Sequence, residues 1–471
     1  GIPFQAIWDQ PIGSGPQPST VSGTMELSER TDTALNLGLP PGLLTGQGIG
    51  RVRVTLPVDD TAPAFQVETD LRGIRLSSPP LGWSKAAQTP ATLSVTGLLG
   101  ETPRVDRLVL DAPGLRASGV ITLRPDGGLA RARFDRVRVG QWLDAPVDLV
   151  GRGANVPPAI NVRGGTLDLR QADFGGSGSG SAGRQGGGPL NLTLDQLLVT
   201  DTIRLTGLTG EFDMARGLNG AFQARINGAT PIRGEVLPQN GRSAIRITSD
   251  DAGGVAASAG ILKQARGGTL SLALRPVGSA SFDGSLSIRE TRIQDAPAIA
   301  ALLNALSIVG LLEQMGGSGI HFQEVEAAFR LTPSVMTLTQ ASAIGPSMGL
   351  SMFGTYDVNR SILDMQGVIS PLFIINGIGS VFTRKGEGLI GFNYALRGAA
   401  AKPQVQVNPL SALTPGMFRE IFRSQPPALP SVSEDAVPVI PDANALTEPA
   451  EPTETIAERR MRLRQEERDS R

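Results

Sequence analysis

The chain has 471 residues, of which 43 are basic and 44 acidic, so its formal net charge is −1. This balance excludes a field strong enough to attract nucleic acid or anionic lipid headgroups over the whole body. Cysteine is absent, which excludes a disulfide framework and cysteine-based metal sites. The 59 glycines and 35 prolines predict many short strands joined by turns rather than long helices.

The apolar residues are mostly aliphatic, since aromatic side chains make up only 4% of the chain. Two interpretations fit this: a smooth aliphatic surface suited to acyl chains, or a compositional bias toward Ala, Gly and Arg. No apolar run reaches the roughly 18 residues that a transmembrane helix needs, and no signal peptide is present. Because the chain begins at Gly1 without a methionine, we expect it to be a piece of a longer protein.

The first predicted region, residues 1–174, is a series of short strands bounded by glycine, proline or aspartate. Within it, Val52, Val54 and Leu56 alternate with polar neighbours, and this period of two predicts a sheet with one dry and one wet face. A glycine–hydrophobic–Thr–Leu pattern recurs without the fixed spacing of a solenoid. We therefore expect one kind of strand, used many times, to form the N-terminal part of a β-groove.

Residues 175–188 are rich in glycine and serine and hold no large apolar side chain that would anchor them. They are predicted to form a long surface loop between neighbouring strands, and a linker between two domains is the alternative. Strand alternation resumes at once with Leu190, Leu192 and Leu194, which favours the loop. The second predicted region follows over residues 189–424.

A single apolar helix is predicted over residues 296–312. Asp295 is placed to accept hydrogen bonds from the free N–H groups of the first turn, and Pro297 suits that turn because it lacks an N–H. The large side chains share one face at helical spacing, and we expect that face to cap or plug an apolar surface of the sheet. These helix residues are Ile299, Leu302, Leu303, Leu306 and Val309.

Strands on both sides of this helix alternate cleanly, with one apolar and one polar side. The apolar side is predicted to line a groove that is open to acyl chains. By alternation alone, the predicted lining residues are Leu270, Leu272, Leu274, Leu286, Ile288, Phe392, Tyr394, Leu396, Val405 and Val407.

The C-terminal part differs in composition from the strands before it. Residues 425–455 are rich in proline and acidic side chains, with little to pack, and are predicted to be disordered. Residues 456–471 are predicted to form a charged helix, in which Glu458 and Arg462 are spaced for an ion pair. A solvated helix is the simple interpretation, and docking to a partner is the alternative.

The sequence offers no catalytic signature. Residues 345–349 match the Gly-x-Ser-x-Gly spelling of a nucleophile elbow, which needs a helix after it and a later histidine. Strand alternation follows instead, and the only histidine, His321, comes earlier, so a turn between strands is predicted. One histidine without cysteine cannot build the usual zinc site, and residues 46–50 lack the phosphate-loop spacing. Basic side chains with few aromatics between them argue against a nucleic-acid platform. We therefore expect no enzyme activity, no metal, no cofactor and no nucleic acid.

The stretch that holds this helix and the strands after it resembles the C-terminal region of the AsmA-like superfamily, in particular large envelope proteins of the YhdP/TamB type and their DUF3971-like relatives. The resemblance is a pattern of strands and turns and covers roughly residues 205–423. The residues that carry it are Gly354-Thr355-Tyr356-Asp357, Gly367-Val368-Ile369-Ser370-Pro371, Phe373 to Asn376, Gly398, and Val407-Asn408-Pro409-Leu410-Ser411 leading to Pro415-Gly416.

From alternation we expect a mainly β fold: an elongated, twisted, mostly antiparallel sheet curled into an open groove, a repeating β-groove or taco. The resemblance implies a bridge-like protein of the Gram-negative periplasm that carries glycerophospholipid between inner and outer membrane. It also implies a tether to the inner membrane through an N-terminal segment, and envelope partners at the C-terminal end. Acyl chains would slide along the dry face while headgroups stay in water.

Two other classes of function are open to the same sequence. The first is a structural or assembly factor for outer-membrane biogenesis with a closed β-sandwich core, because a sandwich also has one dry face per sheet. The second is an enzyme acting on envelope glycan, which needs a pair of carboxylates in a cleft. No such pair is recognisable in the sequence.

Overall fold

The structure is a computed structural model that describes residues 3–13, 15, 17–35, 39–153, 156–172, 187–239, 241–278, 281–295, 297–306, 309–371, 391–400, 402–413, 427 and 429. All of these residues lie in one unit, Gly1–Glu434, and the second unit, Asp435–Arg471, lies outside them. Most of the predicted Gly/Ser-rich loop and C-terminal linker, and all of the charged helix, are therefore outside the described residues.

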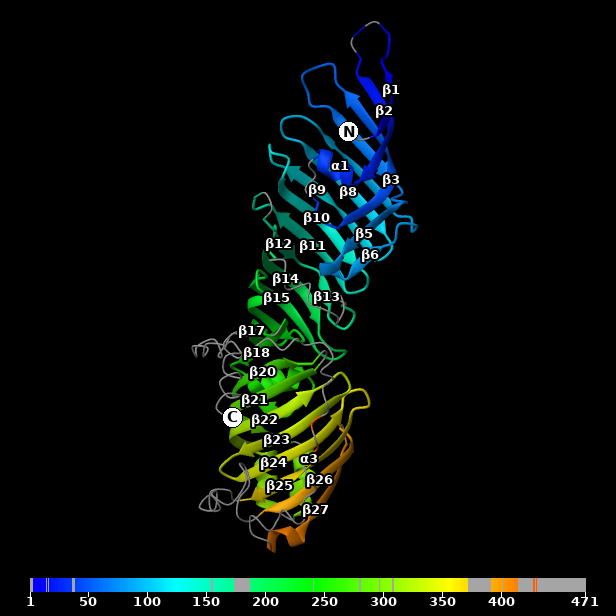
Figure 1. The fold of residues 1–471 in the computed structure, drawn as a ribbon. Helices are drawn as coiled ribbons and strands as arrows, with labels where there is room; N and C mark the ends of the chain where they lie inside the picture. Colours follow the sequence, from blue (N-terminus) through cyan, green and yellow to red (C-terminus); the bar gives the residue numbers. More distant parts are fainter. Residues whose placement is uncertain are drawn as a thin grey trace, which may run out of the picture. The chain divides into compact units, whose positions relative to one another are not determined.

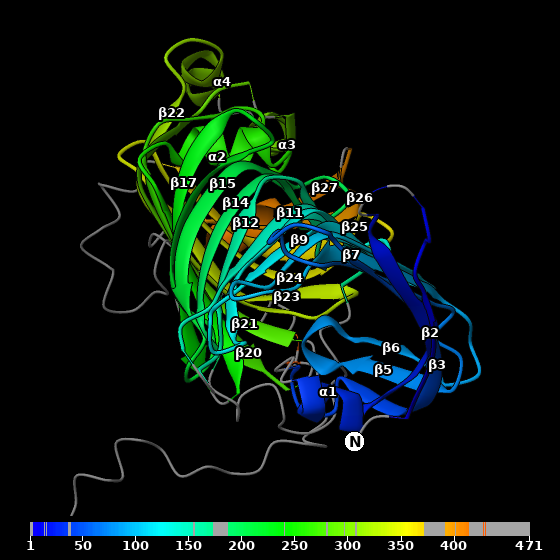
Figure 2. The same cartoon turned by 90° about the horizontal axis from the view of Figure 1, so that it is seen from above.

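The described chain is mainly β, and its strands form a large, twisted, mostly antiparallel sheet, which confirms that part of the prediction. The strands follow one another along the sheet largely in chain order, from β1 in blue to β27 in orange (Figure 1). Their direction changes progressively (Figure 2), because each strand carries a right-handed twist.

The N-terminal elements are β1 (Phe4–Asp9), β2 (Ser19–Ser28), α1 (Glu29–Leu35), β3 (Leu44–Leu56), β4 (Ala64–Thr69), β5 (Ile74–Ser78), η1 (Pro79–Leu81), β6 (Trp83–Lys85), β7 (Thr92–Leu98), β8 (Arg104–Ala112), β9 (Leu115–Leu123), β10 (Leu129–Val139) and β11 (Leu143–Val150). Strands β5 and β6 form a short hairpin that joins the large sheet through β3.

The central elements are β12 (Ala159–Arg163), β13 (Thr166–Asp168), β14 (Pro189–Leu198), β15 (Arg204–Asp213), β16 (Asn219–Ile226), β17 (Thr230–Gln239), β18 (Arg242–Ser249), α2 (Ala252–Ser258), β19 (Ala265–Arg266), β20 (Thr269–Val277) and β21 (Ser281–Ile293). Strands β12 and β13 run parallel to β14. The other pairings of the named strands in the described chain are antiparallel.

The C-terminal elements are α3 (Pro297–Ala305), α4 (Val309–Gly316), β22 (Ile320–Leu331), β23 (Val335–Ile344), β24 (Met348–Asp357), β25 (Ile362–Pro371), β26 (Phe392–Ala399), β27 (Gln404–Asn408) and η3 (Pro409–Leu413). The predicted turn at residues 345–347 is the connection of β23 to β24, where the Gly345 N–H donates to the Met348 carbonyl at 2.9 Å. A strand on each side is the wrong setting for a nucleophile elbow.

The single helix predicted over residues 296–312 is instead two short helices, α3 and α4. Helix α3 ends at Ala305, and the Leu306 N–H donates to the Leu303 carbonyl at 3.2 Å, a tight i−3 bond typical of a last turn. Serine and β-branched residues follow in the sequence, and both types form helix less readily than Ala or Leu. The apolar spacing that predicted one helix therefore extends past the end of α3 at Ala305.

Two phenylalanine rings lie over glycines of the neighbouring strand. Phe222 is the register partner of Gly234, and Phe329 is that of Gly284. A Cβ placed on Gly234 would lie 2.1 Å from Cζ of Phe222, and one on Gly284 would lie 2.2 Å from Cζ of Phe329. The rings thus occupy the space that a side chain would take, an arrangement known to protect strand glycines.

Candidate functional site: the apolar face of the sheet

The pairing register keeps one side of the sheet apolar from β2 to β27, and we call this side the apolar face. At the N-terminal end, Val21 lies opposite Val54, which lies opposite Phe65. At the C-terminal end, Ile369 lies opposite Phe392, and Tyr394 opposite Val407. Register is strongly specified where one face is apolar, because a slip of one residue would turn every apolar side chain to the other side.

The opposite side carries cross-strand pairs of arginine and aspartate over much of its length. Asp283 on β21 accepts two hydrogen bonds from Arg330 on β22, at 2.7 and 3.0 Å. Asp148 on β11 accepts from Arg163 at 2.9 Å and also from Arg131. A layer of protein packed on this side would have to desolvate these charges, which is costly.

A hairpin covers the apolar face near the N-terminal end. Trp83 of β6 is 8% exposed and packs with Ile74, Val139 and Trp142 in one buried cluster. Its indole N–H donates to the Pro113 carbonyl at 2.8 Å. Lys85, two residues after Trp83 on the same strand, is only 2% exposed. Nothing in the sequence pattern assigned either residue to a covering element.

Helix α2 covers the face near the middle of the chain. Asp251 caps it by accepting from the Gly254 N–H at 2.8 Å, and Ala252 and Val255 are buried in one cluster with Leu270. The predicted lining residues on β20 and β21 lie on the apolar face around this cluster. Leu270 is 8% exposed, whereas four of them are half-buried: Leu272, Leu274, Leu286 and Ile288.

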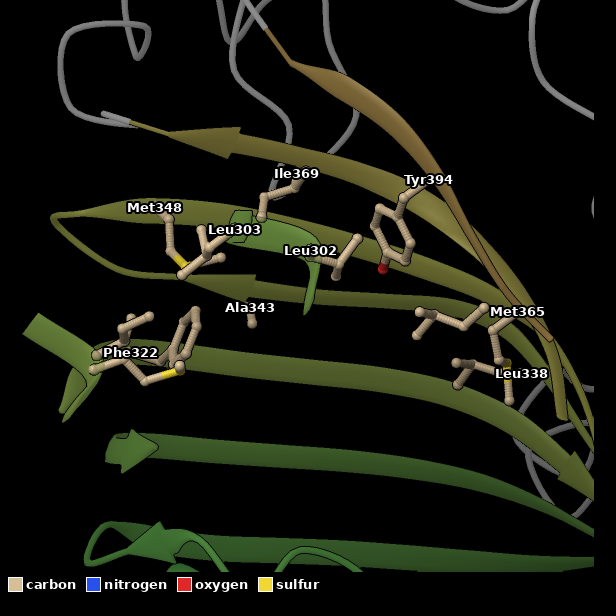
Figure 3. Packing of buried hydrophobic residues seen from close by; sticks show 12 residues of the cluster. Leu302, Leu303, Phe322, Leu338, Ala343, Met348, Met365, Ile369 and Tyr394 are labelled. Carbon is tan, nitrogen blue, oxygen red and sulfur yellow. The ribbon is translucent and has the colours of Figure 1, made fainter. Parts of the chain in front are cut away.

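Helix α3 covers the face near the C-terminal end, and its predicted plug residues do point at the sheet. Leu302 and Leu303, at 2% and 0% exposure, pack against Phe322, Met348 and Tyr394 (Figure 3). Ile299 and Leu306 are half-buried at the border of this cluster. The side chain of Val309 lies outside the described part.

The predicted lining residues on β26 and β27 all belong to this same cluster. Tyr394 and Leu396 are 3% and 6% exposed, and the Tyr394 hydroxyl donates to the Ser351 carbonyl at 2.8 Å. Phe392, Val405 and Val407 are half-buried. Here, therefore, the apolar face is filled largely by protein, while on β20 and β21 four of the five predicted lining residues are half-buried.

Polar groups on the described residues do not assemble into a metal site. His321 pairs with Glu290, with 2.9 Å between Nε2 and Oε2. No group of three or more His, Asp or Glu side chains in the described ranges is arranged to hold a metal ion. Among the helices that the structure describes, none is sufficiently long and apolar to cross a bilayer.

These features define a class: a mainly β protein built on one large twisted sheet, aliphatic on one side and charged on the other. In comparisons with protein-family models, with curated proteins and with solved structures, nothing matches this chain.

Proposed function

We propose that the apolar face is a path for phospholipid acyl chains, in a bridge-like protein that moves glycerophospholipid between the inner and outer membranes of the bacterial envelope. The observation that carries the proposal is the row of half-buried aliphatic side chains that continues from strand to strand on one side of the sheet, such as Val162, Leu192, Leu272 and Leu286. Water-soluble proteins rarely expose a contiguous apolar surface larger than roughly a few hundred Å² unless it binds something.

An acyl chain suits this surface because both are aliphatic and featureless. Burial of CH₂ groups is non-directional and contributes about 0.8 kcal/mol per group, so a tail keeps its stabilisation as it slides from one strand to the next. The rings of Phe222 and Phe329 lie over glycines, where they occupy the place of a glycine side chain. No bond is made or broken in such transport.

One continuous sheet, rather than two separate stacked sheets, favours a groove over a sandwich. The described strands belong to one sheet, to which the β5–β6 hairpin is joined through β3. The charged outer side, with pairs such as Arg330–Asp283, is unsuited to a second apolar layer. The resemblance of residues 205–423 to AsmA-like envelope proteins supports the same proposal, with a periplasmic location, an inner-membrane tether and envelope partners at the C-terminal end.

The test is photocrosslinking from the apolar face. The photoreactive amino acid p-benzoylphenylalanine replaces Leu272 in one sample and Ser271 in the other. These neighbours on β20 face opposite sides, and Ser271 is exposed. After irradiation of protein expressed in a Gram-negative host, mass spectrometry is expected to find phospholipid tails attached at position 272 and not at 271. Crosslinking of tails at neither position, or equally at both, would contradict the proposed lipid path.

A structural or assembly role is the second candidate, and one observation favours it. Protein already covers the apolar face at three places, through the β5–β6 hairpin, α2 and α3. If these coverings were continuous, the face would be an ordinary core. Absence of crosslinked and co-purifying phospholipid would support this scaffold.

A further inference from the structure

Six aliphatic side chains on neighbouring strands form a row across the apolar face, from β18 to β24. Each is the register partner of the next one in the row. The members of this aliphatic row, all of them half-buried, are Ile247, Leu272, Leu286, Ala327, Ala341 and Met352. The first three border the buried cluster that includes helix α2, and the last three border the cluster that includes helix α3. The row therefore connects two covered places on the face.

Several positions beside the row are more deeply buried than the row itself. On β20, Leu270 is 8% exposed, whereas Leu272 is half-buried. On β23, Ala343 and Leu338 are the apolar-face residues on either side of Ala341, and they are 9% and 7% exposed. The row thus keeps partial exposure at points where its neighbours on the same face lose it.

The side chains of the row carry no charge, no hydroxyl and no amide group. The charged residues next to it in sequence, such as Arg246 and Glu326, alternate to the opposite side of the sheet. A peptide or a sugar lying on the row would leave polar groups without hydrogen-bond partners, which is costly. A hydrocarbon chain has no such groups, so the chemistry of the row fits an acyl tail.

The length of the row also suits a tail. Neighbouring strands lie about 4.8 Å apart, so six strands span about 24 Å. One phospholipid tail fills half of the roughly 30 Å hydrocarbon core of a bilayer, or about 15 Å. A tail that follows the row would therefore contact about four strands, and it would be shorter than the row.

We propose that the aliphatic row binds one phospholipid tail that runs across the strands, from register partner to register partner, and not along any single strand. The inference rests on the proposed lipid path. It adds the direction of the tail and three lining residues beyond those predicted from alternation: Ala327, Ala341 and Met352.

The first experiment compares two positions on β24 by photocrosslinking. The photoreactive amino acid p-benzoylphenylalanine replaces Met352, which lies in the row, or Tyr356, which is half-buried on the same face. Tyr356 belongs to a different row, which leads through Met336 and Leu331 to Phe282. After irradiation in a Gram-negative host, mass spectrometry is expected to find phospholipid tails attached at position 352, with loss of the attachment at 356.

The second experiment fills the row. Ala327→Phe is combined with p-benzoylphenylalanine at position 272, two strands away along the row. The matched control is Ala328→Phe, because Ala328 is exposed and lies on the opposite side of β22. The added ring is expected to lower the crosslinking yield at 272 about tenfold, the effect of roughly two lost CH₂ contacts, and the control is expected to leave it unchanged. Urea unfolding checks that both variants are folded, and the comparison of 352 with 356 does not depend on them.

Equal attachment of tails at positions 352 and 356 would overturn the row, and so would an unchanged yield at 272 in folded Ala327→Phe protein. If tails still attach at 272 and not at 271 in the otherwise unchanged protein, the lipid path survives either result and only the direction of the tail is wrong. Tails at neither 272 nor 352 would remove the row and the proposed function together.

Discussion

Lys85 places a buried ammonium group in the hairpin that covers the apolar face. Its Nζ lies 2.9 Å from the Leu71 carbonyl oxygen and 2.8 Å from that of Ile74. It also lies within 3.1 Å of the Ala86 and 2.7 Å of the Thr89 carbonyl oxygens. Burial lowers the pKa of Lys85, and the charge of Asp70 opposes this. These contacts satisfy backbone groups that the irregular chain around the hairpin would otherwise bury unpaired.

Substitution Lys85→Met is expected to lower the free energy of unfolding by about 3 kcal/mol, because several buried carbonyls would lose their donor. The control Lys263→Met changes an exposed lysine and should stay within about 0.5 kcal/mol of wild type. Urea unfolding followed by tryptophan fluorescence is the measurement, since Trp83 and Trp142 lie in the adjoining cluster. An unchanged midpoint for Lys85→Met would show that water or rearranged backbone replaces the ammonium.

Ionised Asp148, on the charged side of the sheet, makes the stability of the fold depend on pH. Its side chain is 2% exposed, and burial by itself would raise its pKa. The hydrogen bond from Arg131 and the charges of Arg163 and Arg131 outweigh burial, so the pKa lies below its usual value. The unfolded carboxylate has a pKa of about 3.9. The folded state therefore gains stability from ionised Asp148 above that pH, and loses it as pH falls through the lower folded pKa.

Substitution Asp148→Asn is expected to cost about 2 kcal/mol at pH 7, a modest value because Arg131 is 55% exposed to solvent. The difference from wild type should shrink as the pH drops below about 4. Urea titrations at pH 7, 4 and 3 measure this. Asp106→Asn, at an exposed pair with Arg104, serves as the comparison and should cost under about 1 kcal/mol. A gap that stays constant with pH would rule out ionised Asp148 as its source.

At the scale of elements, phenylalanine rings on some strands pack over glycines of the neighbouring strand. Gly284 on β21 and Phe329 on β22 form such a pair. A larger residue at position 284 would push the ring away from the sheet toward the proposed acyl path. Fold stability and lipid content are thus linked at this position.

Substitution Gly284→Val is expected to destabilise the fold by about 2 kcal/mol through overpacking, and to reduce co-purifying phospholipid. Ser285→Val, one residue on, changes an exposed side chain on the outer side and should do neither. Thermal unfolding and lipid extraction measure the two effects. A stable Gly284→Val protein with normal lipid content would mean that the ring has space to move without entering the path.

The covering elements also decide how much of the apolar face is available. Helix α3 covers Tyr394 with Leu302 and Leu303 (Figure 3). On β20 and β21, by contrast, Leu272 and Leu286 are only half-buried. A lipid path along β20 and β21 thus needs less rearrangement than one along β26. The first crosslinks are for this reason expected at position 272.

At the scale of the whole molecule, each strand contacts mainly its neighbours along the sheet. Stability in such an arrangement is close to a sum of neighbouring terms, as in repeat proteins. The same continuity lets one aliphatic surface extend over many strands, which a small closed sandwich does not provide. A continuous aliphatic surface and modest local stability follow from the same architecture.

Much of this fold was predictable from alternation. Ile232, Gly234 and Val236 are buried on β17 and alternate with exposed partners, and the predicted lining residues of β20 and β21 do share a face. The helix prediction was less accurate, because an apolar spacing continues through Ser307 and Ile308 although helix α3 ends at Ala305. Helix α2 was missed, although Asp251 before an alanine-rich run is a start signal.

The sequence by itself determined the β class and, in strands without a bulge, the side of the sheet on which the side chains lie, because a period of two is a local property of an extended chain. Only the tertiary structure decided what covers the apolar face and which charged side chains are hydrogen-bonded to each other. Trp83 reaches a carbonyl 30 residues away, and Asp144 accepts its hydrogen bonds from Arg136 although Arg138 is its register partner. Such outcomes depend on distances between strands, which no local pattern contains.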